Sequence, residues 1–172
     1  MNQTKEQEEK WYAVVTKYRN EKMIAKKLQA IGIEAFVPLI ERVKQYASRK
    51  KVHYLPLVSC YVFVKVAPKT FVKVLEITNV FHFVKFGDEI AEITESEISL
   101  LKRITEVDYP IEVSEPSIFH QGDHVEIIEG PLAGIKGTLV RNQNKNKFLV
   151  EFDKLEKTIA IEVEDRLLRR LD

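Results

Sequence analysis

The sequence of 172 residues has a single cysteine, Cys60, so an internal disulfide bond is excluded. Because Cys60 stands inside an apolar run, we expect it to be a small core residue in a reducing cytoplasm. No apolar run approaches the ~18 residues of a membrane span, and the start MNQTKEQEEK lacks the apolar segment of a signal peptide. The sequence therefore predicts a cytoplasmic protein without a membrane partner, whose residues 1–9 form a flexible tail.

The sequence also lacks the groups of residues on which enzymes depend. Its four histidines form no ligand cluster, since Gly122 between His120 and His124 disfavours a helix that would present both to a metal. Local sequence supports no Cys–His pair, no nucleophile elbow and no paired carboxylates. We therefore predict a protein that is not an enzyme and has no catalytic residues, metal site or cofactor.

The net charge of +1 conceals an asymmetry between the two halves of the chain. Residues 1–105 contain 18 Lys and Arg against 12 Asp and Glu, whereas residues 106–172 contain 9 against 14. Within residues 17–53 the count is 10 basic to 3 acidic. Such a division indicates that one half faces a polyanion and the other does not.

Residues 10–105 alternate strand and helix signals. Strands are predicted at 11–16, 33–38, 58–66 and 80–86, the last ending at a Gly-Asp turn. A first helix is expected to begin at Asn20, to bury Ile24, Leu28 and Ile31, and to stop at Gly32. Further helices are expected from Pro68 and from the capping-box spacing of 94–97. The order β-α-β-β-α-β-α predicts an α+β sandwich with an antiparallel or mixed sheet flanked by helices.

The remainder of the chain has a different character. Residues 106–118 hold two prolines and no sustained period, which indicates an extended joint between domains. Residues 119–172 contain strand-like runs at 123–129, 137–142, 147–152 and 158–163, with a polar loop at 142–147. Short strands and tight turns with no helix predict a small all-β barrel.

Four glycines are crowded into residues 122–140, GDHVEIIEGPLAGIKGTLV. A phosphate-binding P-loop needs four residues between its glycines, then Lys and Ser or Thr, and a helix after them. Here three residues separate two of the glycines and a strand pattern follows, so the turn geometry of a hairpin is the better interpretation. The glycines concerned are Gly122, Gly130, Gly134 and Gly137.

This glycine-rich stretch resembles the KOW motif of transcription elongation factors and ribosomal proteins, which lies in an SH3-like barrel. The upstream stretches KWYAVVTKYRNE, PLVSCYVFVKV and ITNVFHFVKFGDE are similar to the NGN domain of the NusG family. The resemblance covers about residues 10–171 and is nearest to the specialised RfaH- and UpxY-type paralogues. It implies a monomeric elongation or antitermination factor that suppresses pausing or termination, with an NGN domain at 10–105 and a KOW domain at 119–172.

The resemblance also implies an apolar depression on the NGN domain that binds the clamp helices of RNA polymerase. The alternative for each candidate is that it fills the core; the hydroxyls of Tyr12 and Tyr61 favour an edge, and hence the interface, for these two. The family pattern has Pro-Gly before the strand tyrosine, where this chain has Ser59-Cys60. The candidates are Trp11, Tyr12, Val58, Tyr61, Val80 and Phe81.

A basic stretch is the second candidate site, because Lys and Arg neutralise phosphate and nearby aromatics can stack on unpaired bases. Residues 42–54 are expected to form an exposed hairpin or loop with Tyr46, His53 and Tyr54 between the cations. The alternative is a merely solvated face, while the resemblance implies contact with upstream or non-template DNA. The candidate cations are Lys17, Arg19, Lys22, Lys26, Arg42, Lys44, Arg49, Lys50 and Lys51.

For the KOW domain the resemblance implies a protein partner, either a small-subunit ribosomal protein or the termination factor Rho. The expected contact is the loop 152–163, in which Leu155 stands at the place of an aromatic residue in the general factor. The acidic excess of this domain argues against its gripping nucleic acid. Two alternatives stay open: a ribosome- or RNA-binding KOW module without polymerase contact, and a plain interaction scaffold.

Overall fold

A computed structural model describes residues 8–114, 122–142 and 145–171 of the chain. The chain divides into two compact units, residues 1–101 and 102–172. This division falls inside the last helix of the first unit, upstream of the expected joint at 106–118. Residues 1–7 of the expected tail and residues 115–118 of the expected joint lie outside the described parts.

The first unit is built on an antiparallel sheet in the order β2-β5-β1-β6, with β9 also paired to β1. β1 is the hub, because it pairs with β5 along one edge and with β6 and β9 along the other. The strands are β1 (Lys10–Thr16), β2 (Glu34–Phe36), β5 (Tyr61–Val66), β6 (Val80–Phe83) and β9 (Glu92–Ile93). The sheet and the helices around it confirm the predicted fold class of this unit.

Helices α1 (Glu21–Ala30) and α2 (Phe71–Leu75) pack against one face of this sheet, where Ile24, Leu28 and Val74 join the core. A 3₁₀ turn, η1 (Pro68–Thr70), leads into α2 as the proline predicted. Ile31, predicted on the apolar face of α1, is 55% exposed because the helix ends at Ala30 and Ile31 is the capping residue. Asn20 precedes α1 but makes no side-chain cap; its amide instead donates to the Tyr18 carbonyl.

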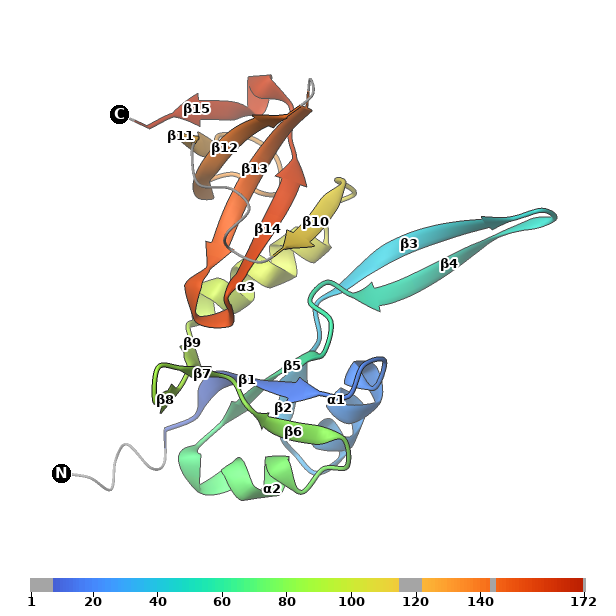
Figure 1. Cartoon of the computed structure of the whole chain (residues 1–172), viewed down its shortest axis with the longest axis vertical. Helices are drawn as coiled ribbons and strands as arrows, with labels where there is room; N and C mark the ends of the chain where they lie inside the picture. The colour runs from blue at the N-terminus through green and yellow to red at the C-terminus, as the bar shows by residue number, and fades with distance from the viewer. Residues whose placement is uncertain (1–7, 115–121, 143–144, 172) are drawn as a thin grey trace. The chain divides into compact units, whose positions relative to one another are not determined.

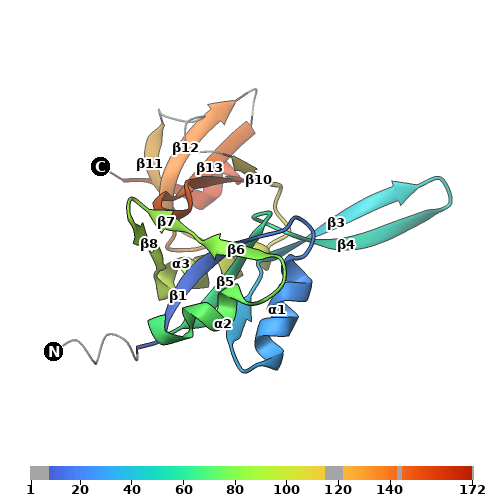
Figure 2. The same ribbon diagram turned by 60° about the horizontal axis from the view of Figure 1, so that its bottom comes forward.

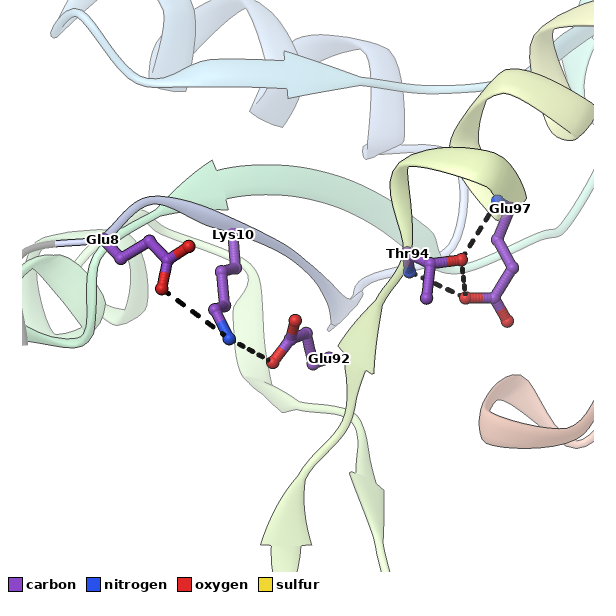
Figure 3. A network of polar contacts seen from close by, with 5 residues as sticks. All are labelled: Glu8, Lys10, Glu92, Thr94 and Glu97. Carbon is purple, nitrogen blue, oxygen red and sulfur yellow. Dashed lines mark hydrogen bonds and ion pairs between the residues drawn. The ribbon is translucent and has the colours of Figure 1, made fainter. Parts of the chain in front are cut away.

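Helix α3 (Glu95–Thr105) begins with the predicted capping box (Figure 3). The Thr94 backbone N–H donates to Glu97 Oε2 at 2.7 Å, and the Glu97 N–H donates back to Thr94 Oγ1 at 3.2 Å. This exchange satisfies two backbone donors that a helix start leaves without partners. Beside it, Lys10 Nζ bonds Glu92 Oε2 at 2.9 Å and ties β1 to β9, and this carboxylate raises the pKa of Lys10.

A small hairpin interrupts the edge of the sheet between β6 and β9. It consists of β7 (Lys85–Phe86) and β8 (Glu89–Ile90), joined by a turn in which Gly87 has φ +63°. The strand predicted at 80–86 is therefore two short strands, and β6 and β9 together complete the edge beside β1 (Figure 1). Such an interruption shortens the free edge that another chain could pair with.

The predicted basic hairpin forms a two-stranded sheet of its own, made of β3 (Leu39–Tyr46) and β4 (Arg49–Pro56). It projects away from the sheet of the first unit in both views (Figure 1, Figure 2). At its base the Leu57 N–H donates to the Pro38 carbonyl at 2.7 Å, which closes the ladder where the two strands leave the sheet.

The second unit is a six-stranded antiparallel sheet in the order β10-β14-β13-β12-β11-β15, as predicted for an all-β KOW barrel. Its short 3₁₀ turns are η3 (Asp153–Leu155) and η4 (Asp165–Leu167). Its strands are β10 (Ile111–Ser114), β11 (Asp123–Ile127), β12 (Lys136–Asn142), β13 (Lys145–Phe152), β14 (Lys157–Glu162) and β15 (Leu168–Arg170). The expected joint thus contains a strand, because β10 pairs with β14, and the expected loop at 142–147 is mostly strand.

The glycine-rich turn between β11 and β12 has the geometry that its sequence predicts. Gly130 and Gly134 both have φ +82°, a left-handed backbone that side chains disfavour. At Gly137 an added Cβ would lie 2.3 Å from the Leu149 carbonyl oxygen, so only glycine lets β12 approach β13 there. The turn leads directly into strand β12, and Arg103 braces it by donating to the Pro131 and Ala133 carbonyls.

Candidate protein-binding and nucleic-acid-binding surfaces

The strand register assigns each residue of β1 and β5 to one of two sheet faces, because side chains alternate along a strand. Tyr12 and Val14 of β1, with Val62 and Val64 of β5, lie in the core beneath α1 and α2. Trp11, Ala13 and Val15 must therefore lie on the opposite face. That face is closed at one end of the strands and open at the other.

The closed end contains Trp11 and Phe63, which are 2% and 0% exposed. Lys65 pairs with Trp11 across the β1–β5 ladder, and its ammonium lies 5.9 Å from the centre of the indole ring. The same ammonium bonds Glu95 Oε1 at 2.6 Å, and this hydrogen bond raises the pKa of Lys65. Because Glu95 is the first residue of α3, the ion pair fixes the start of α3 beside Trp11.

The open end is a row of three directly paired residues, Tyr61 on β5, Val15 on β1 and His82 on β6. We call these three residues the Tyr61 row. Tyr61 and Val15 are half-buried and His82 is exposed. By contrast, Ala13 and Phe63, two residues further along β1 and β5 on the same face, are buried. Phe81 precedes His82 in β6, has no partner in the β1–β6 register because it falls at the bulge, and is 59% exposed. An aromatic and aliphatic surface of this kind, open to solvent on a rigid sheet, is suited to binding an apolar partner.

Only Tyr61 and Phe81 of the six predicted polymerase-contact residues have accessible side chains. Trp11, Tyr12, Val58 and Val80 are all buried. The expectation that the Tyr12 hydroxyl keeps this residue at an edge is wrong. Its ring meets Phe71 and Phe83 edge to face at 5.0 and 6.1 Å, and burial raises the pKa of the phenol.

Sequence reasoning missed Val15 and His82. The alternation within WYAVVT contains part of the signal, since Val15 shares a face with Trp11 and not with Tyr12. The rest depends on the register between β1 and β6, which shifts at a bulge between Val15 and Thr16. Pairing across such a bulge cannot be read from either segment alone.

Cys60, in the turn that leads into Tyr61, has a left-handed backbone with φ +67°. The Cys60 N–H donates to Glu21 Oε1 at 2.7 Å, and the Cys60 carbonyl accepts the Thr16 N–H at 2.8 Å. The Glu21 carboxylate is buried at the first residue of α1, so the turn is tied to both α1 and β1. Cys60 is half-buried, not a core residue as expected, and desolvation raises the pKa of its thiol.

The β3–β4 hairpin separates its charges by face. Lys44 lies opposite Lys51 and Arg42 opposite His53, and Arg49 shares this face because it stands two residues from Lys51. We call Arg42, Lys44, Arg49 and Lys51 the hairpin cation row. Beyond the Leu39–Pro56 pair at the base, the other face holds three pairs: Glu41 with Tyr54, Val43 with Val52, and Gln45 with Lys50.

The remaining predicted cations lie on and before α1. Lys17, Arg19 and Lys26 are exposed, and the Arg19 guanidinium lies 5.2 Å from the centre of the Tyr18 ring. Lys22 is also exposed, but its ammonium bonds the Tyr54 carbonyl at 2.9 Å. Lys22 thus links α1 to the hairpin, so the two groups of cations belong to one part of the first unit.

In the second unit the expected partner residue is not on the surface. Leu155 is 2% exposed within η3, and β14, which forms half of the expected contact loop, lies between β10 and β13. Several of the unit's cations are held by acids: Lys147 by Glu112, Arg169 by Glu126, and Arg170 by Asp123. These ion pairs leave less positive charge for nucleic acid.

Over the described residues, acids, histidines and the cysteine come together nowhere in a group of three that could hold a metal. None of the helices in the same parts of the chain is long and apolar enough to cross a membrane.

Comparisons with known proteins give one match to a family model and several matches to solved structures. Residues 9–102 match the family model described as NusG, transcription termination factor nusG. The search of curated proteins found no match. The structure is similar to that of NusG from Thermotoga maritima, with 21% identity over 95% of this chain and 98% of that chain and a TM-score of 0.55, which shows a shared fold. It also matches a chain of the MjSpt4:Spt5 complex, with 19% identity over 94% and 97% of the two chains and a TM-score of 0.31.

Proposed function

Because the chain belongs to the NusG family of transcription elongation factors, we propose that its first unit binds the clamp helices of elongating RNA polymerase and suppresses pausing or termination. We take the binding surface to be the Tyr61 row with Phe81 beside it. The observation that carries this proposal is the open end of the sheet face, where Tyr61 and His82 remain accessible while Ala13 and Phe63, further along the same face, are sealed.

This surface has the physical properties of a binding site for a helical tip. Aromatic side chains offer a large contact area at low entropic cost, and they dominate the binding energy of most protein interfaces. The surface lies on strands that are fixed by the β1 ladders and by the Cys60 turn, so little ordering is needed on binding. A helix against an apolar depression is a recurring recognition mode.

The proposed mechanism involves no bond making or breaking. A factor that binds the elongating form of polymerase more tightly than the paused form shifts the balance toward elongation, and only the difference in affinity has an effect. The resemblance to RfaH- and UpxY-type factors supports action on particular operons. The cations of α1 and the hairpin cation row support additional contact with upstream or non-template DNA.

The test is binding of purified polymerase to the whole protein carrying Tyr61→Ala or Phe81→Ala. We expect each change to weaken binding about tenfold or more, as for an interface residue that contributes above about 1.4 kcal/mol. Phe86→Ala is the matched control, because Phe86 is 57% exposed, close to the 59% of Phe81, but lies on the β7–β8 hairpin. The proposal is wrong if polymerase binding survives both changes, or if Phe86→Ala weakens binding as much.

For the second unit we propose a protein partner, as the resemblance implies, either a small-subunit ribosomal protein or Rho. Its contact does not include the Leu155 side chain, which is buried. The alternative of an RNA-binding module without polymerase contact predicts salt-sensitive binding of structured RNA by residues 102–172. Recovery of the ribosome but not polymerase, on purification of the whole protein from cells, would favour that alternative.

A further inference from the structure

The hairpin cation row concentrates like charges in a way that folding alone does not favour. Lys44 lies directly opposite Lys51, and like charges in this position destabilise an antiparallel pair. Among the described side chains of that face, from Ile40 to Leu55, none is acidic. The opposite face, by contrast, carries one acid, Glu41, and one base, Lys50, so its charges cancel.

We propose that the β3–β4 hairpin binds double-stranded DNA through the hairpin cation row and not through its opposite face. This inference deepens the DNA contact of the proposed function and rests on it. The row brings four cations together on one side of a two-stranded ribbon. Binding neutralises the phosphates and releases their counterions, which offsets the repulsion that the row carries in the free protein.

The shape of the hairpin favours a duplex. A two-stranded antiparallel ribbon fits the major groove of B-DNA, which is about 12 Å wide. The described residues of both strands between Glu41 and Leu55 are exposed or at most half-buried, so no other element covers either face. The closed ladder at the base and the bond from Lys22 to the Tyr54 carbonyl hold the ribbon at its root, which leaves its length free to enter a groove.

The placement of the aromatic residues argues against a single strand as the partner. Binding of single-stranded nucleic acid depends on aromatic platforms on which bases stack. Tyr54 is exposed, but it lies on the face away from the cation row, with its hydroxyl 3.4 Å from Glu41 Oε2. His53 is on the row's face but only half-exposed. The side chain of Tyr46 lies outside the described parts. The stacking role expected for Tyr54 beside these cations is therefore not supported.

Lys50 and Lys51 provide a matched pair for the test, since they are consecutive exposed lysines on opposite faces of β4. Binding of the whole protein to a labelled duplex, and to one of its strands alone, is measured without polymerase by fluorescence anisotropy over a range of salt concentrations. We expect Lys51→Gln to weaken duplex binding roughly fivefold and Lys50→Gln to leave it nearly unchanged.

The double variant Lys44→Gln with Lys51→Gln sharpens the result. With four phosphate contacts, raising salt from 50 to 200 mM should cost the unmodified protein roughly a hundredfold in affinity, and the double variant only roughly tenfold. Equal losses for Lys50→Gln and Lys51→Gln would overturn the proposal, because binding would follow total charge and not a face. So would tighter binding of the single strand, or duplex binding unchanged in the double variant.

A negative result for duplex binding by the hairpin can be told apart from a negative result for polymerase binding. The duplex assay contains no polymerase, whereas the polymerase assay varies Tyr61 and Phe81, neither of which lies on the hairpin. Loss of face-specific duplex binding with polymerase binding intact would remove this inference alone.

Discussion

The β1–β5 pair and the β3–β4 pair obey the same hydrogen-bonding rules but lie in opposite surroundings. In β1 and β5 nearly every side chain between the ends is buried, on both faces of the sheet. In β3 and β4 hardly any side chain is buried on either face. Core packing therefore restricts the residues of the first pair, whereas the residues of the second pair are exposed to solvent.

The largest expected effect tests this contrast directly. Phe63→Ala should lower the free energy of unfolding of the first unit by about 3–5 kcal/mol, because it removes a large, fully buried ring between sheet neighbours. The measurement is urea unfolding followed by the fluorescence of Trp11, the only tryptophan in the chain, which reports on this unit.

The matched change in the hairpin is Val43→Ala. Val43 is an apolar strand residue like Phe63, but it is 56% exposed opposite Val52, so we expect a loss below about 0.5 kcal/mol. A comparable loss at Val43 and Phe63 would mean that the hairpin is packed in solution, and the contrast between the two pairs would not hold.

A smaller effect is expected where the sheet holds a strained turn. Cys60→Gly should raise the stability of the first unit by about 1 kcal/mol, because Cys60 has φ +67° and a side chain disfavours this backbone. The bond from the residue 60 N–H to Glu21 does not depend on the side chain and is retained. The same Trp11 unfolding measurement applies.

Cys60→Ala is the control for this prediction, since it removes the thiol and keeps the Cβ that causes the strain. If Cys60→Ala stabilises the unit as much as Cys60→Gly, the thiol and not the backbone is the source. If neither change stabilises it, the turn is unstrained, and the Tyr61 row owes less to this turn than its contacts suggest.

The sequence predicts most of the elements because their signals are local. The alternation in WYAVVT, the capping box at Thr94 and Glu97 and the glycine turn after β11 each depend on a few neighbouring residues, and the structure contains all three. The basic hairpin is likewise an element that local sequence predicts.

The sequence alone does not predict features that depend on pairing between distant strands. Strand β10 lies in a proline-containing stretch that reads as a joint, and it is a strand because β14, almost fifty residues later, pairs with it. Tyr12 and Tyr61 look alike in the sequence, yet one is sealed and the other half-open, because the β1–β5 register assigns them to opposite faces. The separation of Lys50 from Lys51 likewise follows only from the alternation of an actual strand.

The smallest expected effect sharpens the account of the hairpin. Lys44→Glu replaces a like-charge pair with an opposite-charge pair facing Lys51, so we expect the hairpin to gain about 0.5 kcal/mol of local stability. Slower exchange of the hairpin's backbone amides is the readout, since it reports local opening. Lys50→Glu is the control, because Lys50 faces the neutral Gln45 and should gain less.

The same Lys44→Glu protein should bind duplex DNA more weakly, so the gain in stability and the loss in binding come from one charge. If the exchange is unchanged, the free hairpin carries no repulsion between Lys44 and Lys51, and DNA binding has no such repulsion to offset.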